Sequence, residues 1–158
     1  EAMAYALNDS DFEEAHIQLM DWPSVGMIGD FSNEEREFDA LLSVKTKVNE
    51  QLEQARQSKL IGQSLDAKAI IEISSKDKMF SLLQKHEEIL PEVFIISQVE
   101  IREIASDGQC SVKITTASGE RCPRSWKWVD HLVDAGPFGR VSQKCFEALV
   151  EKYENLLK

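Results

Sequence analysis

The sequence predicts an α+β fold, in which a long helix precedes a small β-α-β-β sheet domain and a C-terminal knuckle with a last helix. Three observations support this prediction. Apolar residues recur every three or four positions over about 33–58, which is typical of an amphipathic helix. The pattern changes to a period of two at 67–73, which is typical of a strand. The tryptophan-rich, basic stretch at 121–140 follows neither period.

The N-terminal part is expected to contain two helical segments joined by an extended one. Residues 2–7 look helical but have no N-cap before them, which suggests the end of a longer helix. Residues 15–20 alternate weakly and read as extended. Ser32 and Glu35 form a capping box at the start of the long helix, and Gly62 ends it. The apolar stripe of this helix consists of Phe38, Leu41, Val44, Val48, Leu52 and Ala55.

The middle of the chain is expected to form one small sheet covered by a helix. In the strand at 67–73, alternate residues from Ala67 to Ile73 share one face. A helix follows at about 76–90, with Ser74 and Ser75 as its cap. Two further strands are expected at 93–104 and 110–117, and a last helix at 141–157.

The second and third strands are expected to pair as an antiparallel hairpin. The segment between them, Ser106–Gln109, has the sequence Ser-Asp-Gly-Gln. An Asp-Gly pair between apolar runs is a strong hairpin signal.

The composition excludes several classes of protein. The 158 residues are 42% hydrophobic and 29% charged, as in a globular chain. The longest apolar runs have four or five residues, whereas a spanning helix needs about 20, so we expect no membrane partner. Three cysteines are too few for a disulfide scaffold, so we expect a cytoplasmic location.

The negative charge is regional. The formal net charge is −10, which by itself argues against a nucleic-acid partner. Residues 1–40, however, hold 11 acidic residues and one basic residue, and residues 41–158 hold 17 of each. Within 121–145 there are five basic residues and two acidic ones. A basic site near the C-terminus is therefore compatible with the composition.

The eight residues Arg121–Trp128 carry three basic side chains, two indoles and no acid. This combination suits a surface that binds phosphates and stacks bases. The alternative is a turn whose tryptophans fill a core. The sequence leaves both interpretations open.

The cysteines resemble half of a zinc knuckle. Tetrahedral zinc in such a knuckle takes four thiolates from two Cys-x-x-Cys pairs, but here Cys122 is paired with Ser125, and Ser142 with Cys145. A serine hydroxyl is not ionised at neutral pH, and His131 would add only a third ligand. We therefore expect a metal-free knuckle held by packing. A Cys122–Cys145 disulfide is not expected in a reducing cytosol.

The chain shows no credible active site. It has no glycine-rich phosphate loop and no nucleophile elbow, and its acidic residues at 1–40 have no apolar setting that would raise a pKa. We expect no catalytic residue in this chain.

Five stretches follow one another along the chain: Glu14–Ile17 with Asp21–Pro23, Val48–Glu50 with Ala55–Arg56, Arg56–Lys68, Phe94–Val99, and Gly119–Trp126. In this order they resemble stretches of the bacterial-type isoleucyl-tRNA synthetases. Residues 56–68 are similar to the lysine–x–isoleucine–glycine–x–serine–leucine–x–alanine stretch of that family, and the last stretch matches the opening of the family's zinc knuckle.

The resemblance implies a C-terminal fragment with three parts. Residues 1–62 would end the helical anticodon-binding domain, 63–118 would form a junction domain, and 119–158 a degenerate zinc knuckle. The full-length ligase would attach isoleucine to its tRNA using ATP and magnesium. Its adenylate-forming and editing domains would lie outside this chain and would be its partners, together with tRNA. We expect no cofactor in the fragment and no DNA partner.

The resemblance also implies residues for tRNA recognition. Trp126 would stack on a base splayed out of the anticodon loop, flanked by Arg124 and Lys127. The residues expected to contact phosphates are Arg121, Arg140 and Lys144. Many family members have four cysteines here; because only Cys122 and Cys145 are present, we regard these two as vestigial and expect no zinc.

Two alternatives from other classes stay open at this point. One is a stand-alone acidic protein-interaction module that uses residues 1–40 and has no RNA role. The other is a small metal-dependent regulatory domain. The length of the parent gene would discriminate against both, and the zinc content would test the second.

Overall fold

The computed structural model of the chain describes residues 29–105 and 110–153, which form an α+β fold as the sequence predicts. The segments expected at 2–7 and 15–20 lie outside the described residues. The helices are α2 (Ser32–Gln57), α3 (Lys78–Lys85), α4 (Leu90–Phe94) and α5 (Gln143–Tyr153), with 3₁₀ turns η3 (Ser64–Asp66), η4 (Glu87–Ile89) and η5 (Gly136–Phe138). The strands are β1 (Ala67–Ser74), β2 (Gln98–Ile104), β3 (Ser111–Thr116), β4 (Glu120–Arg121), β5 (Trp128–Val129), β6 (Val133–Asp134) and β7 (Arg140–Val141).

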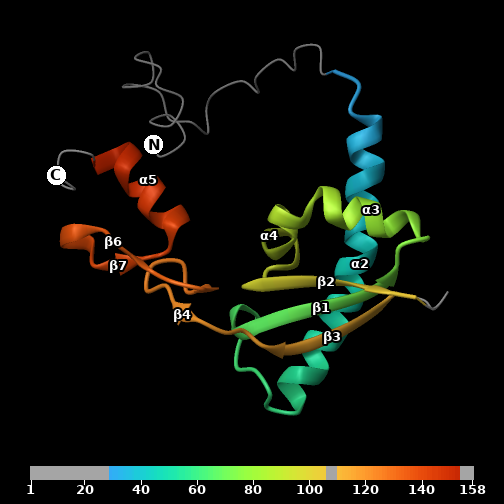
Figure 1. Cartoon of the computed structure of the whole chain (residues 1–158), viewed down its shortest axis with the longest axis horizontal. Helices are drawn as coiled ribbons and strands as arrows, with labels where there is room; N and C mark the ends of the chain where they lie inside the picture. Colours follow the sequence, from blue (N-terminus) through green and yellow to red (C-terminus); the bar gives the residue numbers. More distant parts are fainter. Residues whose placement is uncertain (1–28, 106–109, 154–158) are drawn as a thin grey trace, which may run out of the picture. The chain divides into compact units, whose positions relative to one another are not determined.

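Helix α2 confirms the predicted long amphipathic helix. Its buried residues are Leu41, Val44, Val48, Leu52 and Ala55, which lie on the predicted stripe. Phe38 was expected on the same stripe but is exposed. Figure 1 shows α2 passing across the three-stranded sheet, with α3 and α4 beside β2.

Strand β1 is the centre of the sheet. Ala67, Ala69, Ile71 and Ile73 are fully buried, as the period of two predicts, and they pack into one core with α2, α3 and α4. The opposite face of the sheet carries charged side chains, among them Lys68, which forms a 2.6 Å ion pair with Glu100. The sheet therefore has one face covered by helices and one partly polar face.

The predicted antiparallel hairpin between the second and third strands is wrong, because β1 lies between them. The strand order is β2-β1-β3, as Figure 1 shows. β2 is parallel to β1, with Val99 opposite Ala69 and Ile101 opposite Ile71, and β3 is antiparallel to β1. A strand as buried as β1 needs a hydrogen-bonded neighbour on each side to satisfy its backbone groups. The turn signal at 106–109 lies outside the described residues.

The single helix predicted at 76–90 is divided into α3, η4 and α4. Asp77, and not Ser74 or Ser75, caps α3, because its carboxylate accepts the N–H of Met79 at 2.9 Å. Pro91 lies in the first turn of α4, where its missing N–H costs no hydrogen bond. Helix α4 therefore continues to Phe94, and the strand expected from residue 93 begins only at Gln98.

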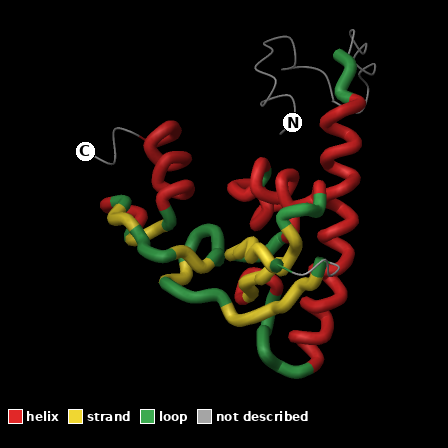
Figure 2. Tube along the Cα trace, turned by 45° about the vertical axis from the view of Figure 1, so that its right-hand side comes forward, coloured by secondary structure: helices red, strands yellow, loops and turns green. Residues whose placement is uncertain are grey.

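The C-terminal knuckle consists of two very small hairpins followed by α5. Strand β4 pairs with β5, and β6 pairs with β7, both antiparallel. Helix α5 begins two residues later than predicted, and residues 154–158 lie outside the described part of the chain. Figure 2 shows these elements following the sheet along the chain. Cys122, Ala135, Val141 and Leu149 form their own small core.

Candidate nucleic-acid interface

A glycine starts the hairpin that carries the candidate residues. Gly119 has a φ of +101°, and a Cβ at this position would lie 2.1 Å from the carbonyl oxygen of Val129. Only glycine allows this approach of the two strands. The hairpin then pairs Glu120 with Val129 and Arg121 with Trp128.

The segment between β4 and β5 is a turn held by its own backbone. The N–H of Cys122 donates to the carbonyl of Lys127 at 2.9 Å, and the N–H of Trp126 donates to the carbonyl of Cys122 at 2.8 Å. We call residues 122–127 the Trp126 turn. Its hydrogen bonds fix the backbone on both sides of the indole.

The two tryptophans of this segment have different roles. Trp126 is 59% exposed and has a φ of +62°, in the left-handed region. Trp128 is half-buried; its backbone N–H donates to Oγ of Ser97 at 2.8 Å, and its Nε1 donates to Oδ1 of Asp66 at 3.2 Å. Trp126 therefore lies on the surface. Trp128 links the knuckle to Asp66 and Ser97, which lie next to strands β1 and β2 of the three-stranded sheet.

Asp66 and Ser97 accept the two hydrogen bonds from Trp128. Ser97 Oγ donates to the carbonyl of Leu65 at 2.6 Å. Burial raises the pKa of Asp66, but hydrogen bonds from Trp128 and Gln63 outweigh it, so the pKa lies below its usual value. Sequence reasoning missed this anchor, although both residues lie in stretches that carried the resemblance, Arg56–Lys68 and Phe94–Val99.

The three candidate arginines are exposed, and each has a partner. Arg121 Nε donates to the carbonyl of Trp126 at 3.4 Å, and Arg124 Nη1 donates to the carbonyl of Cys145 at 3.3 Å. Arg140 donates to both carboxylate oxygens of Glu120, at 2.9 and 3.1 Å. Arg121 and Arg124 thus border the Trp126 turn, whereas the charge of Arg140 is matched by a carboxylate.

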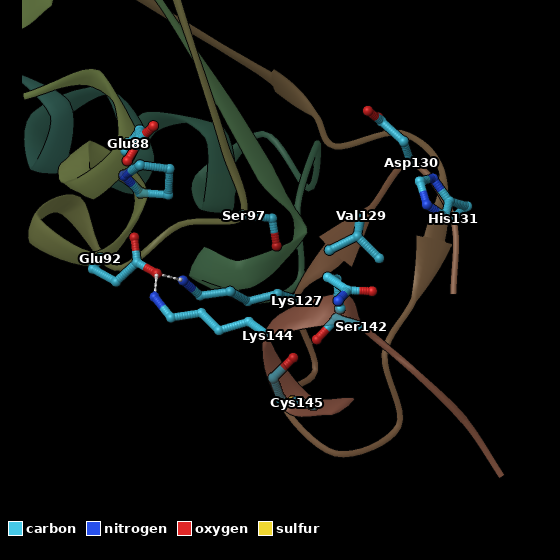
Figure 3. Close-up of a pocket in the computed structure, with 13 residues that line it drawn as sticks. Glu88, Glu92, Ser97, Lys127, Val129, Asp130, His131, Ser142, Lys144 and Cys145 are labelled. Carbon is cyan, nitrogen blue, oxygen red and sulfur yellow. Dashed lines mark hydrogen bonds and ion pairs between the residues drawn. The ribbon is translucent and has the colours of Figure 1, made fainter. Parts of the chain in front are cut away.

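The two candidate lysines meet at one carboxylate of α4. Lys127 and Lys144 lie 3.1 and 2.8 Å from the same oxygen, Oε1 of Glu92, and Figure 3 shows both side chains extending toward it. Burial raises the pKa of Glu92, but hydrogen bonds from Lys144 and Lys127 outweigh this and lower it. These three side chains line a cavity of about 600 Å³ that Ser97 and Cys145 also border.

Cys122 and Cys145 lie together in the knuckle core. Their Sγ atoms are 3.9 Å apart. The backbone N–H groups of Ser125 and Ser142 donate to Cys122 Sγ at 3.4 and 3.3 Å. Burial raises the pKa of the Cys122 thiol, but hydrogen bonds from Ser125 and Ser142 lower it to about 6.

The donor set around Cys122 does not fit structural zinc. It supplies two sulfurs and two neutral hydroxyls, whereas structural zinc takes four ionised or imidazole ligands. Figure 3 shows His131 apart from Cys145, and residues 29–105 and 110–153 contain no group of three or more His, Cys, Asp or Glu that could hold a metal ion. Whether the protein carries zinc stays a prediction.

Within the described part of the chain, no helix is long and apolar enough to cross a membrane. No family model matches the chain. Its sequence is similar to curated isoleucine–tRNA ligases. That of Thermotoga petrophila is 31% identical over 148 residues, which are 90% of this chain and 16% of the relative.

Two other relatives show the same pattern. The isoleucine–tRNA ligase of Caldicellulosiruptor saccharolyticus is 35% identical over 139 residues, 86% of this chain and 15% of the relative. That of Kosmotoga olearia is 38% identical over 115 residues, 71% of this chain and 12% of the relative. The chain thus spans about one sixth or less of the length of the relatives it matches. Along most of its length, the chain is therefore related in sequence to a C-terminal part of the isoleucine–tRNA ligases, as its five motifs predict.

Proposed function

We propose that this chain is the tRNA-recognition end of an isoleucine–tRNA ligase and that the Trp126 turn contacts the anticodon region. The observation that carries the proposal is an indole 59% exposed on a turn whose backbone is hydrogen-bonded on both sides. An exposed aromatic ring with basic neighbours suits the stacking of an unpaired base.

The backbone of Trp126 supports a binding role. A non-glycine residue in the left-handed region costs of order 1–3 kcal/mol and persists only where its surroundings hold it there. Here the Trp126 N–H is bonded to Cys122, and the Trp126 carbonyl accepts from Arg121. The backbone that carries the ring is thus fixed before a base arrives, so less backbone freedom is lost on binding.

The basic residues would position the phosphates around this ring. A guanidinium has five N–H donors, so Arg121 and Arg124 keep donors for RNA beyond their bonds to carbonyls. Lys127 and Lys144 share Glu92, and an RNA phosphate would have to compete with that carboxylate. Arg140 is held by Glu120, so we expect it to contribute least.

The similarity to the isoleucine–tRNA ligases supports the rest of the proposal. Residues 1–62 would end the anticodon-binding helices, 63–118 would form the junction domain, and 119–158 the degenerate knuckle. The full-length protein would use ATP and magnesium to attach isoleucine to tRNA in the cytoplasm, with its catalytic and editing domains outside this chain. The relationship to these ligases supports this function over a stand-alone acidic interaction module.

The test uses Trp126→Ala in the full-length enzyme. We expect tRNA binding to weaken by about 1–3 kcal/mol, the range for one base–aromatic stack. The melting temperature should stay unchanged because the ring is exposed, and isoleucyl-adenylate formation should also be unchanged. Trp128→Ala is the matched control: it should lower the melting temperature because it removes the anchor. Unchanged tRNA affinity in folded Trp126→Ala enzyme would remove Trp126 from the interface.

The phosphate contacts are tested by salt dependence. If Arg121 contacts a phosphate, Arg121→Ala should weaken binding and lower the slope of log affinity against log salt by about one unit. Base preference should not change. Glu92→Gln should act in the opposite direction, because it releases Lys127 and Lys144 from their carboxylate. Equal salt slopes for wild type and both variants would contradict the phosphate assignment.

A further inference from the structure

We propose that Cys122 and Cys145 are a redox site that hydroperoxides oxidise to a disulfide and that thiols reduce again. The two residues come from different elements. Cys122 directly follows β4, and Cys145 lies in the first turn of α5. The fold nevertheless brings their Sγ atoms to 3.9 Å.

The geometry requires only a small movement to form the bond. A disulfide has an S–S distance of about 2.05 Å, so the sulfurs must approach by roughly 2 Å. Both elements belong to the small knuckle core, which has few buried side chains to resist such a shift. Cys110, the remaining cysteine, packs instead against the sheet core.

The two sulfurs have different surroundings, so we assign them different roles in the reaction. Cys145 is half-buried and lines the cavity of about 600 Å³ beside Lys127 and Lys144, so a small oxidant can reach it. Cys122 is fully buried, and two backbone N–H groups donate to its sulfur. These N–H groups favour negative charge on that sulfur, which makes Cys122 the attacking partner in the second step.

The chemistry takes place in two steps. The Cys145 thiolate attacks one oxygen of the hydroperoxide; the O–O bond breaks, hydroxide (or alkoxide) leaves, and Cys145 becomes a sulfenic acid. The Cys122 thiolate then attacks Cys145 Sγ, the S–O bond breaks, and hydroxide leaves as water after taking up a proton. With hydrogen peroxide, the two thiols lose two electrons and two protons, and the peroxide is reduced to two water molecules.

Ser125 and Ser142 leave the sulfurs of Cys122 and Cys145 able to react with an oxidant. Four thiolates around zinc would occupy both sulfurs as metal ligands. With Ser125 and Ser142 in place of two of them, the donor set no longer fits zinc, and the two cysteines are left adjacent to each other. In the cytoplasm we expect the reduced form to predominate and the disulfide to form during peroxide exposure.

The experiment treats the reduced whole chain with hydrogen peroxide and counts its free thiols after denaturation. We expect the count to fall from three to one, with a peptide map that links Cys122 to Cys145, and dithiothreitol should restore all three. Three unreacted thiols would overturn the proposal. A sulfinic acid at Cys145 without the link, or a link to Cys110, would also overturn it.

Two variants serve as controls. Cys110→Ser should lose both of its remaining thiols to the same internal link. Cys145→Ser replaces a half-buried residue, so the chain should stay folded, and it should form no internal disulfide under the same treatment. An internal disulfide in Cys145→Ser would show that Cys110 reaches Cys122 and would overturn the assignment.

Discussion

The three-stranded sheet and the knuckle differ in how much apolar surface each of them buries. Within the described residues, the core of the sheet unit contains 15 buried apolar side chains and that of the knuckle contains four. The knuckle nevertheless carries every residue that we assign to tRNA recognition. A segment with so small a core depends on its contacts with the neighbouring sheet and helices, here the hydrogen bonds of Trp128 to Asp66 and Ser97 and the ion pairs of Glu92.

This comparison teaches that the proposed binding surface lies on a small segment attached to a region with a much larger core. Functional residues are concentrated on loops that a stable scaffold positions. The sheet supplies the stability, and the few polar contacts between the two regions set the position of the Trp126 turn. Four predictions test this division, from the largest expected effect to the smallest.

The largest effect is expected in the sheet core. Ile71→Ala removes a fully buried side chain from the central strand, and we expect it to destabilise the protein by about 4 kcal/mol. Urea unfolding followed by circular dichroism measures this loss. Val141→Ala in the knuckle core is the matched variant; it should cost less and leave the sheet transition in place. Equal losses in both variants would argue against two regions of different stability.

The second-largest effect is expected from a variant of the knuckle that binds zinc. Ser125→Cys with Ser142→Cys restores four thiolates, so the double variant should bind one zinc ion tightly and gain about 3 kcal/mol at a hundredfold excess of zinc over its Kd. The unaltered chain should carry much less than one zinc ion per chain. Elemental analysis measures both. A ratio near one in the unaltered chain would show that serine or His131 completes the ligand set.

The third effect concerns the hydrogen bond between Trp128 and Asp66. Trp128→Phe keeps an aromatic ring but replaces the indole, and it removes the hydrogen bond from Nε1 to Asp66, whose loss should cost about 1 kcal/mol. Because Asp66 loses a donor that lowers its pKa, that pKa should rise in the variant. Thermal unfolding and an NMR titration of Asp66 check the two expectations. Trp126→Phe should change neither.

The smallest effect is a pH dependence at Glu92. Its pKa is lowered in the folded protein, so its ion pairs contribute stability above the usual glutamate pKa of about 4.3 and lose it as the pH falls through the lowered folded value. Glu92→Gln should therefore melt at a lower temperature than wild type at pH 7. The difference should shrink below about pH 4. The same difference at both pH values would exclude Glu92 as a link between α4 and the knuckle.

The sequence alone determined which face of the long helix and of the central strand is buried. The stripe from Leu41 to Ala55 and the alternation from Ala67 to Ile73 both match the observed burial. Periodicity reports which side of a helix or strand meets the core, and this property is local to the element. The motifs at Arg56–Lys68 and Gly119–Trp126 were equally local, and they pointed to the family of relatives without any structure.

Tertiary structure alone decided which elements and side chains became neighbours. The Asp-Gly signal favoured a hairpin between β2 and β3, but β1 lies between them. One face of β1 is buried under the helices, and the strands at its two edges satisfy its backbone hydrogen bonds. Trp126 and Trp128 look equivalent in sequence; the backbone conformation of the turn and the distant Asp66 and Ser97 separate an exposed ring from an anchor. Such pairings depend on residues about 30 to 60 positions away along the chain, which a local pattern does not encode.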